Sequence, residues 1–382
     1  GSFGYPGTPS TEILEYLVDN HENRGGPVAQ WCANEKTAYE TALGVSFAGK
    51  RAIVTMKHVG LNVAADPFMN SSLCQIKGGL ICVVADDPSM HSSQGEQDTR
   101  FYADFAMVPL FEPTNQQEAY EMAAEAFSLS EKFRVPVIMR MVTRLAHSRA
   151  VVHVADSPRK ENILEKGAAA DWMLLPALAR KNYDKMIGKQ AALGEWSSFY
   201  ARNKITINPA RKDIAIVTSG LGRNYYEENL DDLKAASGDK GLPSSLHVAA
   251  MPYPLDLLRQ IADCAETLIV IEEGMPFLEK QLRGLLPGRT RIAGKLSGLL
   301  PRAGELNPDI VRNALCLERK KTVADSFKAP ELPGRPPQLC KGCPHHDSYS
   351  SLNLVVERLN EKEGKVSTVV AADIGCYALG AV

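Results

Sequence analysis

The sequence lacks any surplus of positive charge and any long apolar run. Its 43 Lys and Arg residues are balanced by 45 Asp and Glu residues, which gives a formal net charge of −2. No global positive field is available to attract nucleic acid or an anionic membrane surface, so we expect neither partner. No apolar segment approaches the roughly 20 residues needed to span a bilayer, and the opening GSFGYPGTPS lacks the charged and apolar regions of a signal peptide. These absences predict a soluble, unexported protein.

Cysteine is also sparse, with eight residues in a chain of 382. The cysteines are scattered, some of them within apolar segments such as SSLCQIKGGLICVVA, and do not form the dense framework of a small secreted domain. This distribution is typical of reduced thiols and predicts a cytoplasmic location. The sequence contains no internal repeat and no low-complexity tract.

The chain does contain enough apolar material for several cores. Its 382 residues, 45% of them hydrophobic, exceed the roughly 250–300 residues at which a single core stops growing. Short strand-like runs such as RAIVTMK and GLICVVADD alternate with helical patterns such as TEILEYLVDNH. This alternation predicts a multidomain α/β fold of doubly wound, mainly parallel sheets.

Changes in this pattern divide the chain into parts. We expect a first α/β domain at 1–150, a helical linker at 151–210, a smaller α/β domain at 211–326, a Pro-rich linker at 327–338, and the opening of a third α/β domain at 339–382. The N-terminus opens on a glycine-rich turn with no preceding strand, and the C-terminus stops where a strand and turn begin. We therefore expect both ends to be cut.

Glu35 is the first candidate for chemistry. It lies at the start of a predicted helix, within Asn34-Glu35-Lys36, and a carboxylate there is stabilised by the helix dipole. On this evidence alone, a solvated cap is the more ordinary interpretation. Glu40 is the rival carboxylate, but it falls off the same helical face and is better interpreted as a surface residue.

Two polar segments accompany Glu35. GYPGTPSTE at residues 4–12 is a turn leading into a helix, which Thr8, Ser10 or Thr11 could cap. The second segment, ADDPSMHSSQGEQDTR, follows a predicted strand and includes His91 and Arg100. Ligands of open α/β sheets bind beyond the carboxyl ends of strands, so this loop is a candidate site, although composition alone favours a solvated loop.

A third segment combines Cys340, Cys343, His345 and His346 in the run CKGCPHH. A C-x-x-C pair beside histidines first suggests zinc, but the second pair of a closed site is missing because Cys376 stands alone. The turn at Gly220-x-Gly222 lacks the third glycine of a dinucleotide fingerprint, so an NAD site is disfavoured.

Taken together, these segments resemble the α subunit of the thiamine-diphosphate-dependent 2-oxoacid:ferredoxin oxidoreductases, in the branch that uses indolepyruvate. The resemblance covers essentially the whole chain and implies a thiamine-diphosphate-binding fold followed by a transketolase C-terminal-like domain. It places Glu35 against the aminopyrimidine N1′ of the cofactor and Thr8 against the substrate carboxylate and oxo group. The loop sequence His-Ser-Ser-Gln-x-Glu-Gln-Asp-x-Arg also resembles this branch, and it contains two catalytic candidates, Arg100, which could bind a carboxylate, and His91, which could hydrogen-bond the substrate.

The same resemblance implies further cofactor contacts. Lys57 and His58 stand where many relatives carry a Thr-Ser pair, as in the aryl-pyruvate branch. The diphosphate-binding domain is implied to begin at the CKGC motif and to continue at the turn ADIGC, which yields the candidates Cys340, Gly342, Cys343, His345, Gly375 and Cys376. The Gly-Asp-x motif with a downstream Asn that binds Mg²⁺ in the family is absent, because GDK at 238–240 sits in a polar loop and is not a substitute, so the ligands are expected beyond residue 382.

The implied reaction is oxidative decarboxylation of indolepyruvate or another aryl pyruvate with coenzyme A, giving aryl-acetyl-CoA, CO₂ and reduced ferredoxin. Because no C-x-x-C-x-x-C-x-x-x-C-P run occurs, 4Fe-4S clusters are expected only in a missing C-terminal segment or a partner. The implied partners are a β subunit, in an α2β2-type hetero-oligomer, and ferredoxin. The alternatives are a non-redox thiamine-diphosphate decarboxylase or carboligase, and a non-catalytic assembly subunit.

Overall fold

The computed structural model describes residues 1–155, 161–165, 167–285, 288, 290–320 and 338–363. The chain forms two compact units, residues 1–319 and residues 320–382. The division into finer domains remains a prediction. None of the helices in the described ranges is long and apolar enough to cross a membrane.

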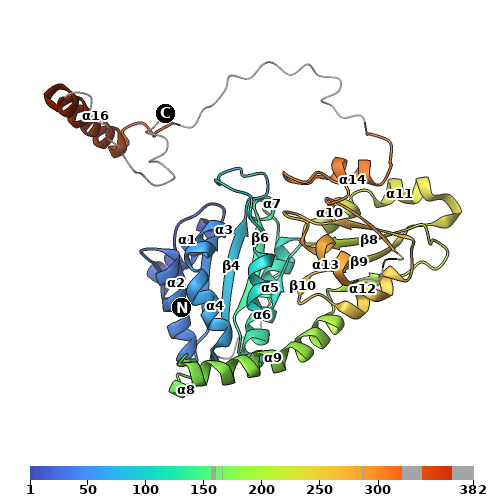
Figure 1. Ribbon diagram of the computed structural model, residues 1–382, viewed down its shortest axis with the longest axis horizontal. Coiled ribbons are helices and arrows are strands. Elements are labelled where there is room, and N and C mark those ends of the chain that lie inside the picture. Colours follow the sequence, from blue (N-terminus) through green and yellow to red (C-terminus); the bar gives the residue numbers. More distant parts are fainter. Residues whose placement is uncertain (156–160, 166, 286–287, 289, 321–337, 364–382) are drawn as a thin grey trace. The chain divides into compact units, whose positions relative to one another are not determined.

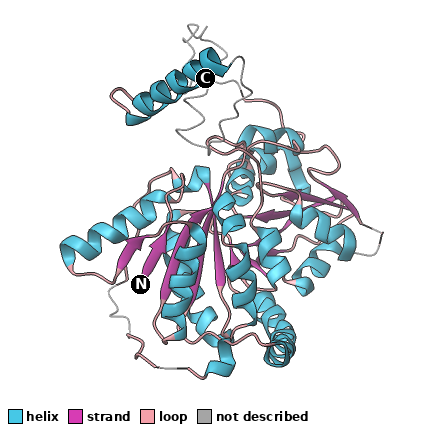
Figure 2. Ribbon diagram, turned by 60° about the vertical axis from the view of Figure 1, so that its left-hand side comes forward, coloured by secondary structure: helices cyan, strands magenta, loops and turns pink. Residues whose placement is uncertain are grey.

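The first unit contains a seven-stranded sheet with the order β10-β5-β6-β4-β3-β1-β2. Its strand pairs are parallel except for β10 and β5. Every residue of β4 is buried, as expected for a central strand that helices cover on both faces (Figure 2). The strands of this sheet are β1 (Ser2–Gly4), β2 (Ala29–Trp31), β3 (Ala52–Lys57), β4 (Leu80–Asp86), β5 (Leu110–Phe111), β6 (Val137–Val142) and β10 (Ala250–Met251).

The expectation that no strand precedes the N-terminal turn was wrong. Residues Ser2–Gly4 form β1, which lies between β3 and β2 in the sheet. Three residues are too short to produce a clear pattern, but their parallel pairing on both sides supplies the backbone hydrogen bonds that hold the strand. The turn GYPGTPS therefore starts at the carboxyl end of a strand.

Helices connect these strands. They are α1 (Thr11–Arg24), α2 (Glu35–Phe47), α3 (His58–Val63), α4 (Ala65–Leu73), α5 (Arg100–Ala106), α6 (Gln116–Phe133) and α7 (Thr143–Ala146). Helix α2 begins with a capping box: the Asn34 side chain accepts a hydrogen bond from the Thr37 amide at 2.9 Å, and the Asn34 amide donates to Thr37 Oγ1 at 3.3 Å. This cap fixes Glu35 as the first helical residue.

A second sheet of five strands has the order β12-β11-β8-β9-β7. Its elements are β7 (Lys204–Thr206), β8 (Ile214–Ser219), β9 (Ser244–Val248), β11 (Thr267–Ile271), β12 (Arg291–Ala293), α10 (Gly222–Glu227), α11 (Leu230–Ser237), the 3₁₀ turn Gly238–Lys240, α12 (Leu255–Ala262), α13 (Phe277–Leu285) and α14 (Pro308–Ala314). Strand β7 lies inside the range expected to be a helical linker, and it pairs antiparallel with β9 at the sheet edge.

The two sheets share one apolar core. Val54 and Ile138 of the first sheet belong to the same buried cluster as Val217 and Leu246 of the second. The helices α8 (Ala169–Trp172) and α9 (Pro176–Phe199) lead from the first sheet to the second, and α9 runs along both of them (Figure 1). Strand β10, from the range that builds the second sheet, completes the first sheet. Residues 320–382 form the other unit, in which α16 (Pro344–Glu363) is described.

Candidate active site

The polar segments singled out in the sequence gather at one edge of the first sheet. The turn at 5–10 follows β1, Lys57 and His58 lie at the end of β3, and the loop at 87–98 follows β4. Because β1, β3 and β4 are parallel neighbours, their carboxyl ends meet at the same edge. This is where open α/β sheets bind their ligands.

Glu35 lies beside Gly60 of α3 at this edge. Its side chain is half-buried, and a Cβ atom added to Gly60 would come within 2.6 Å of Glu35 Oε1 and Cγ. Glycine at position 60 therefore leaves room for the carboxylate. Glu40, by contrast, is exposed and lies 4.0 Å from the Lys36 ammonium on the surface of the same helix. The half-buried carboxylate of Glu35, not that of Glu40, is therefore the one suited to hydrogen-bond a ring nitrogen such as the pyrimidine N1′.

The turn containing Thr8 contacts the loop after β4. Thr8 is exposed, and its carbonyl accepts a hydrogen bond from Ser92 Oγ at 3.5 Å. Lys57 Nζ donates to the carbonyl of Ser92 at 2.7 Å and to its hydroxyl at 3.0 Å. Burial lowers the pKa of Lys57, and the nearby Asp87 carboxylate partly offsets this effect. These hydrogen bonds join the turn after β1, the end of β3 and the loop after β4 into one polar surface.

Asp87 organises the loop after β4 and was missed in the sequence. Its carboxylate accepts hydrogen bonds from the amides of His91 (3.3 Å) and Ser92 (2.9 Å) and from the hydroxyls of Ser93 (2.5 Å) and Thr143 (2.8 Å). Burial raises the pKa of Asp87, but these hydrogen bonds and the Lys57 ammonium outweigh burial and lower the pKa to about 2. Its signal in the sequence was a second acidic residue directly after a buried strand.

The His58 side chain links strand β4 to the loop that follows it. Its side chain is buried, with Nδ1 3.3 Å from the carbonyl of Ala85 and Nε2 3.0 Å from the carbonyl of Gly95. Both ring nitrogens are therefore occupied by backbone oxygens. This geometry gives His58 a positioning role and does not support direct contact with a cofactor.

His91 is half-exposed in the loop after β4. Its Nε2 lies 3.5 Å from Glu305 Oε2, and Arg144 donates to the same carboxylate at 2.6 Å. Glu96 accepts hydrogen bonds from the amides of Ser89 and Gly304, each at 3.3 Å. The segment before α14 thus holds the loop after β4, and nothing in the local sequence indicated this contact.

Arg100 requires a correction. It was expected to bind a substrate carboxylate, but its side chain is 0% exposed. Its guanidinium donates to Asp98 at 2.5 and 2.9 Å, to Glu272 at 2.6 Å, and to the carbonyls of Glu273 and Met275. These bonds join the loop after β4 to the end of β11, so Arg100 connects the two sheets and is not available to a substrate.

The cysteine motif lies in the second unit. Cys340 is exposed, Gly342 has a left-handed backbone with φ of 77°, and Cys343 Sγ lies 3.2 Å from His345 Nδ1. Within the described residues, no group of three or more His, Cys, Asp or Glu side chains could hold a metal. Gly375 and Cys376 lie outside the described residues. The role of this motif in binding a cofactor therefore remains a prediction.

Comparisons with known proteins agree with the motifs. Residues 2–176 match the family model described as pyruvate flavodoxin/ferredoxin oxidoreductase, thiamine diphosphate-binding. The chain is 38% identical to the indolepyruvate oxidoreductase subunit IorA of Archaeoglobus fulgidus, over 98% of this chain and 60% of that protein. It is 36% identical to the subunit of the same name from Thermococcus kodakarensis, over 98% of this chain and 58% of that protein. The chain thus spans about 60% of the length of these relatives.

Two solved structures show the same fold. The 2-oxoglutarate:ferredoxin oxidoreductase from Magnetococcus marinus, with 2-oxoglutarate, coenzyme A and succinyl-CoA bound, matches with a TM-score of 0.62 at 17% identity, over 82% of this chain and 61% of that one. A split-gene transketolase, an inactive β4 tetramer, matches with a TM-score of 0.52 at 16% identity, over 83% of this chain and 93% of that one. These matches confirm the predicted α/β fold class. Residues 2–176 are therefore similar to the thiamine-diphosphate-binding family of pyruvate flavodoxin/ferredoxin oxidoreductases, in agreement with the motifs.

Proposed function

We propose that this chain provides the pyrimidine-binding half of a thiamine diphosphate site in an indolepyruvate-type 2-oxoacid:ferredoxin oxidoreductase. The observation that carries the proposal is the Glu35 carboxylate, fixed at the first position of α2 and packed against Gly60. The exposed Thr8 turn and the loop after β4 lie at the same sheet edge. These residues supply a carboxylate for a ring nitrogen and hydroxyl groups for a small polar substrate.

The proposed reaction is oxidative decarboxylation of an aryl pyruvate with coenzyme A to aryl-acetyl-CoA and CO₂, with two electrons passed to ferredoxin. Thiamine diphosphate, when bound, supplies the electron sink for decarboxylation. Glu35 would hold a proton shared with the pyrimidine nitrogen. The hydroxyl of Thr8 would orient the substrate carboxylate, and the half-exposed His91 would hydrogen-bond the oxo group.

The remaining components belong to the complete enzyme. We infer Mg²⁺ for the diphosphate, with its ligands beyond residue 382, and 4Fe-4S clusters in a C-terminal segment or partner. A β subunit in an α2β2-type assembly and a cytoplasmic location complete the proposal. The choice of indolepyruvate rests on the names of the relatives that match along 98% of this chain.

The substitution Glu35→Gln in the complete enzyme tests this function, with Glu40→Gln on the same helix as the matched control. Turnover, followed by reduction of a redox dye with indolepyruvate, is expected to fall at least about 100-fold for Glu35→Gln, because the amide is a far weaker base. The melting temperature of both variants should match the parent. Full turnover in Glu35→Gln would remove this residue from the mechanism, and release of an aldehyde without dye reduction would indicate a non-redox decarboxylase.

A further inference from the structure

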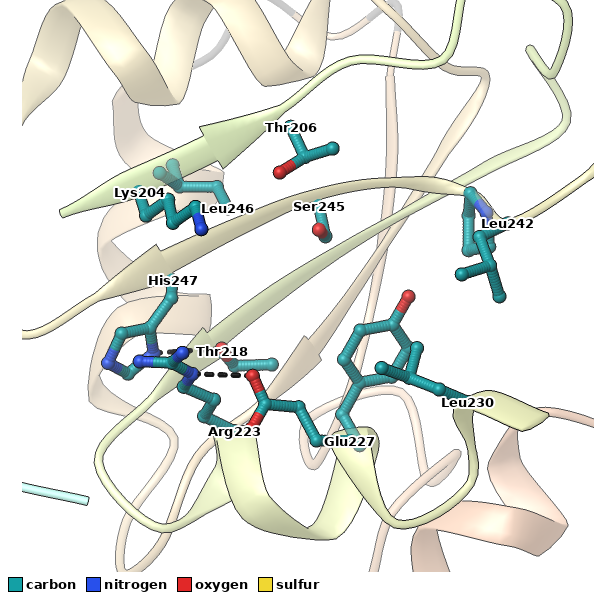
Figure 3. A pocket seen from close by; sticks show the side chains of 12 residues that line it. Lys204, Thr206, Thr218, Arg223, Glu227, Leu230, Leu242, Ser245, Leu246 and His247 are labelled. Carbon is teal, nitrogen blue, oxygen red and sulfur yellow. Dashed lines mark hydrogen bonds and ion pairs between the residues drawn. The ribbon is translucent and has the colours of Figure 1, made fainter. Parts of the chain in front are cut away.

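A cavity of about 230 Å³ lies in the second sheet, among elements that the proposed reaction does not use. Strands β7, β9 and β8 form one wall, and α10 with the start of α11 forms the other (Figure 3). All of these elements belong to the first compact unit. The volume is below the roughly 300–1,000 Å³ typical of sites for drug-sized ligands, so the cavity suits a smaller molecule.

The strand register places polar side chains on one face of this wall. Lys204 of β7 is paired with His247 of β9, which is paired with Thr218 of β8. Thr206 is likewise paired with Ser245. Since side chains alternate between faces along a strand, all five lie on the same face. Lys204 and Thr206 are exposed on the edge strand β7 and Ser245 is half-buried, whereas His247 and Thr218 are buried, so the row of polar side chains runs from the surface into the cavity.

The net charge of the cavity is positive. Among the described residues, the Lys204 ammonium has no hydrogen-bond or ion-pair partner, whereas Arg223 Nε donates to Glu227 at 2.6 Å. Burial, with a contribution from Arg223, lowers the pKa of His247 to about 3, so its ring is neutral at physiological pH. Arg223 pairs with Glu227 and also, at 3.4 Å, with the Glu118 carboxylate outside the cavity lining, which leaves Lys204 as the charged lining residue without a partner of its own among the described residues.

The remaining lining residues add a neutral ring and apolar side chains to the cavity. His247 Nδ1 lies 3.1 Å from Thr218 Oγ1, which fixes the ring in the floor of the cavity. Tyr226 and Leu230 line the helical side, Leu242 lies just before β9, and Figure 3 shows the two leucines at the end of the cavity away from Lys204. One end of the cavity thus carries an ammonium and hydroxyl groups, and the other end is apolar.

We propose that this cavity binds a small organic monoanion, with its oxyanion group on Lys204 and Ser245 and its apolar body against Leu230 and Leu242. A single uncompensated positive charge matches one negative charge, and hydroxyl groups supply additional donors. A phosphate monoester offers similar oxygen acceptors but carries about −1.5 to −2 charges at pH 7, so the single ammonium favours a carboxylate, and the test separates the two. The site is independent of the thiamine diphosphate half-site, because none of its residues lies at the carboxyl ends of β1, β3 or β4.

The test uses isothermal titration calorimetry of the full 382-residue chain with phenylacetate, phenyl phosphate and the uncharged aromatic analogue benzyl alcohol. We expect a dissociation constant of about 1 mM or lower for at least one anion and no measurable binding of benzyl alcohol. The better anion identifies which oxyanion the site prefers. Binding of benzyl alcohol as tight as that of both anions would overturn the proposal.

Variants then place the anion in this cavity. Lys204→Met keeps the aliphatic stem of the side chain and should weaken binding at least about tenfold, since one charged hydrogen bond is lost. Lys234→Met removes an exposed ammonium from α11 outside the cavity and should leave binding unchanged. Ser245→Leu should fill the cavity and abolish binding. Unchanged affinity in both Lys204→Met and Ser245→Leu would show that the anion binds elsewhere and would refute the assignment.

Discussion

The substitution Gly60→Ala tests whether close packing against α3 positions Glu35. A Cβ atom at position 60 would lie 2.6 Å from both Cγ and Oε1 of Glu35 and 2.9 Å from Cδ. Real Cβ contacts essentially never fall below 3.0 Å, so the glutamate side chain must move. Gly60 does not have a left-handed backbone, so alanine introduces a steric change and no conformational strain.

The size of the effect follows from the required movement. Glu35 must shift by about 0.8 Å before its nearest atoms reach 3.4 Å, where ordinary van der Waals contact begins. A misplacement of about 1 Å at a reacting group can cost roughly 100-fold in rate, which corresponds to about 2.7 kcal/mol of transition-state stabilisation. Because the displaced group is the end of a flexible side chain, we expect only a small loss of folding stability.

The assay is kcat/KM for dye reduction by the complete enzyme with indolepyruvate, measured beside the melting temperature. Gly44→Ala is the matched control, since Gly44 lies in α2 and a Cβ there meets no atom within 4 Å. This control should keep full activity and gain about 0.5–1 kcal/mol of stability from the better helix propensity of alanine. A Gly60→Ala enzyme with the kcat/KM of the parent would refute the reasoning.

Three further predictions concern buried charges, and urea unfolding followed by circular dichroism measures each of them. Asp87→Asn should lower the free energy of unfolding by about 2 kcal/mol at pH 7, because the pKa of Asp87 is lowered from 3.8 to about 2. This stabilisation should disappear as the pH falls from 4 toward 2. A variant as stable as the parent at pH 7 would contradict the prediction. Arg100→Met should lower the free energy of unfolding by about 3–5 kcal/mol, because Asp98 and Glu272 would remain buried without their cation. A change below about 1 kcal/mol would be inconsistent with the role of Arg100 in joining the two sheets. Burial raises the pKa of Glu273 from 4.5 to about 7, so the stabilisation from its protonated form is complete below about pH 4.5 and is lost as the pH rises through 7. Glu273→Gln should therefore unfold with a free energy up to about 3 kcal/mol larger than the parent at pH 8 and nearly the same at pH 4, and equal stability at pH 8 would argue against an ionised, buried Glu273.

The long elements of the fold were predictable from local pattern. The apolar runs that became β3, β4 and β6 and the amphipathic segments that became α1 and α6 are long enough for their periodicity to stand out. Short strands were not predictable, because β1 and β7 contain three residues each and depend on pairing with strands distant in the sequence. The shared core of the two sheets was also beyond prediction from one-dimensional pattern.

Some residues of the candidate site were likewise predictable from the sequence and others were not. Glu35 was found because a family motif surrounds it, and Gly60 is the partner that the sequence did not reveal. Composition alone could not distinguish an exposed polar residue from a buried one in the loop after β4. His91 is half-exposed, whereas Arg100 is fully buried, although they stand close together in the same polar run. The burial of Arg100 depends on its ion pair with Glu272, and the position of His91 depends on Glu305. Both glutamates lie far away along the chain.

The buried ion network explains how the second sheet contributes to the site. Asp86, at the end of β4, accepts hydrogen bonds from Arg140 at 2.6 Å and from the amide of Thr99 at 3.1 Å, and Asp98 accepts from Arg100. Replacing such a network with well-packed apolar side chains is often neutral or stabilising, so net stability is a weak reason for its presence. Directional bonds, however, allow one arrangement of the loop after β4 relative to β11, whereas apolar packing would allow several. We infer that the network serves to fix the loop that carries Ser92 against the Thr8 turn, and that the second sheet shapes the site in this way.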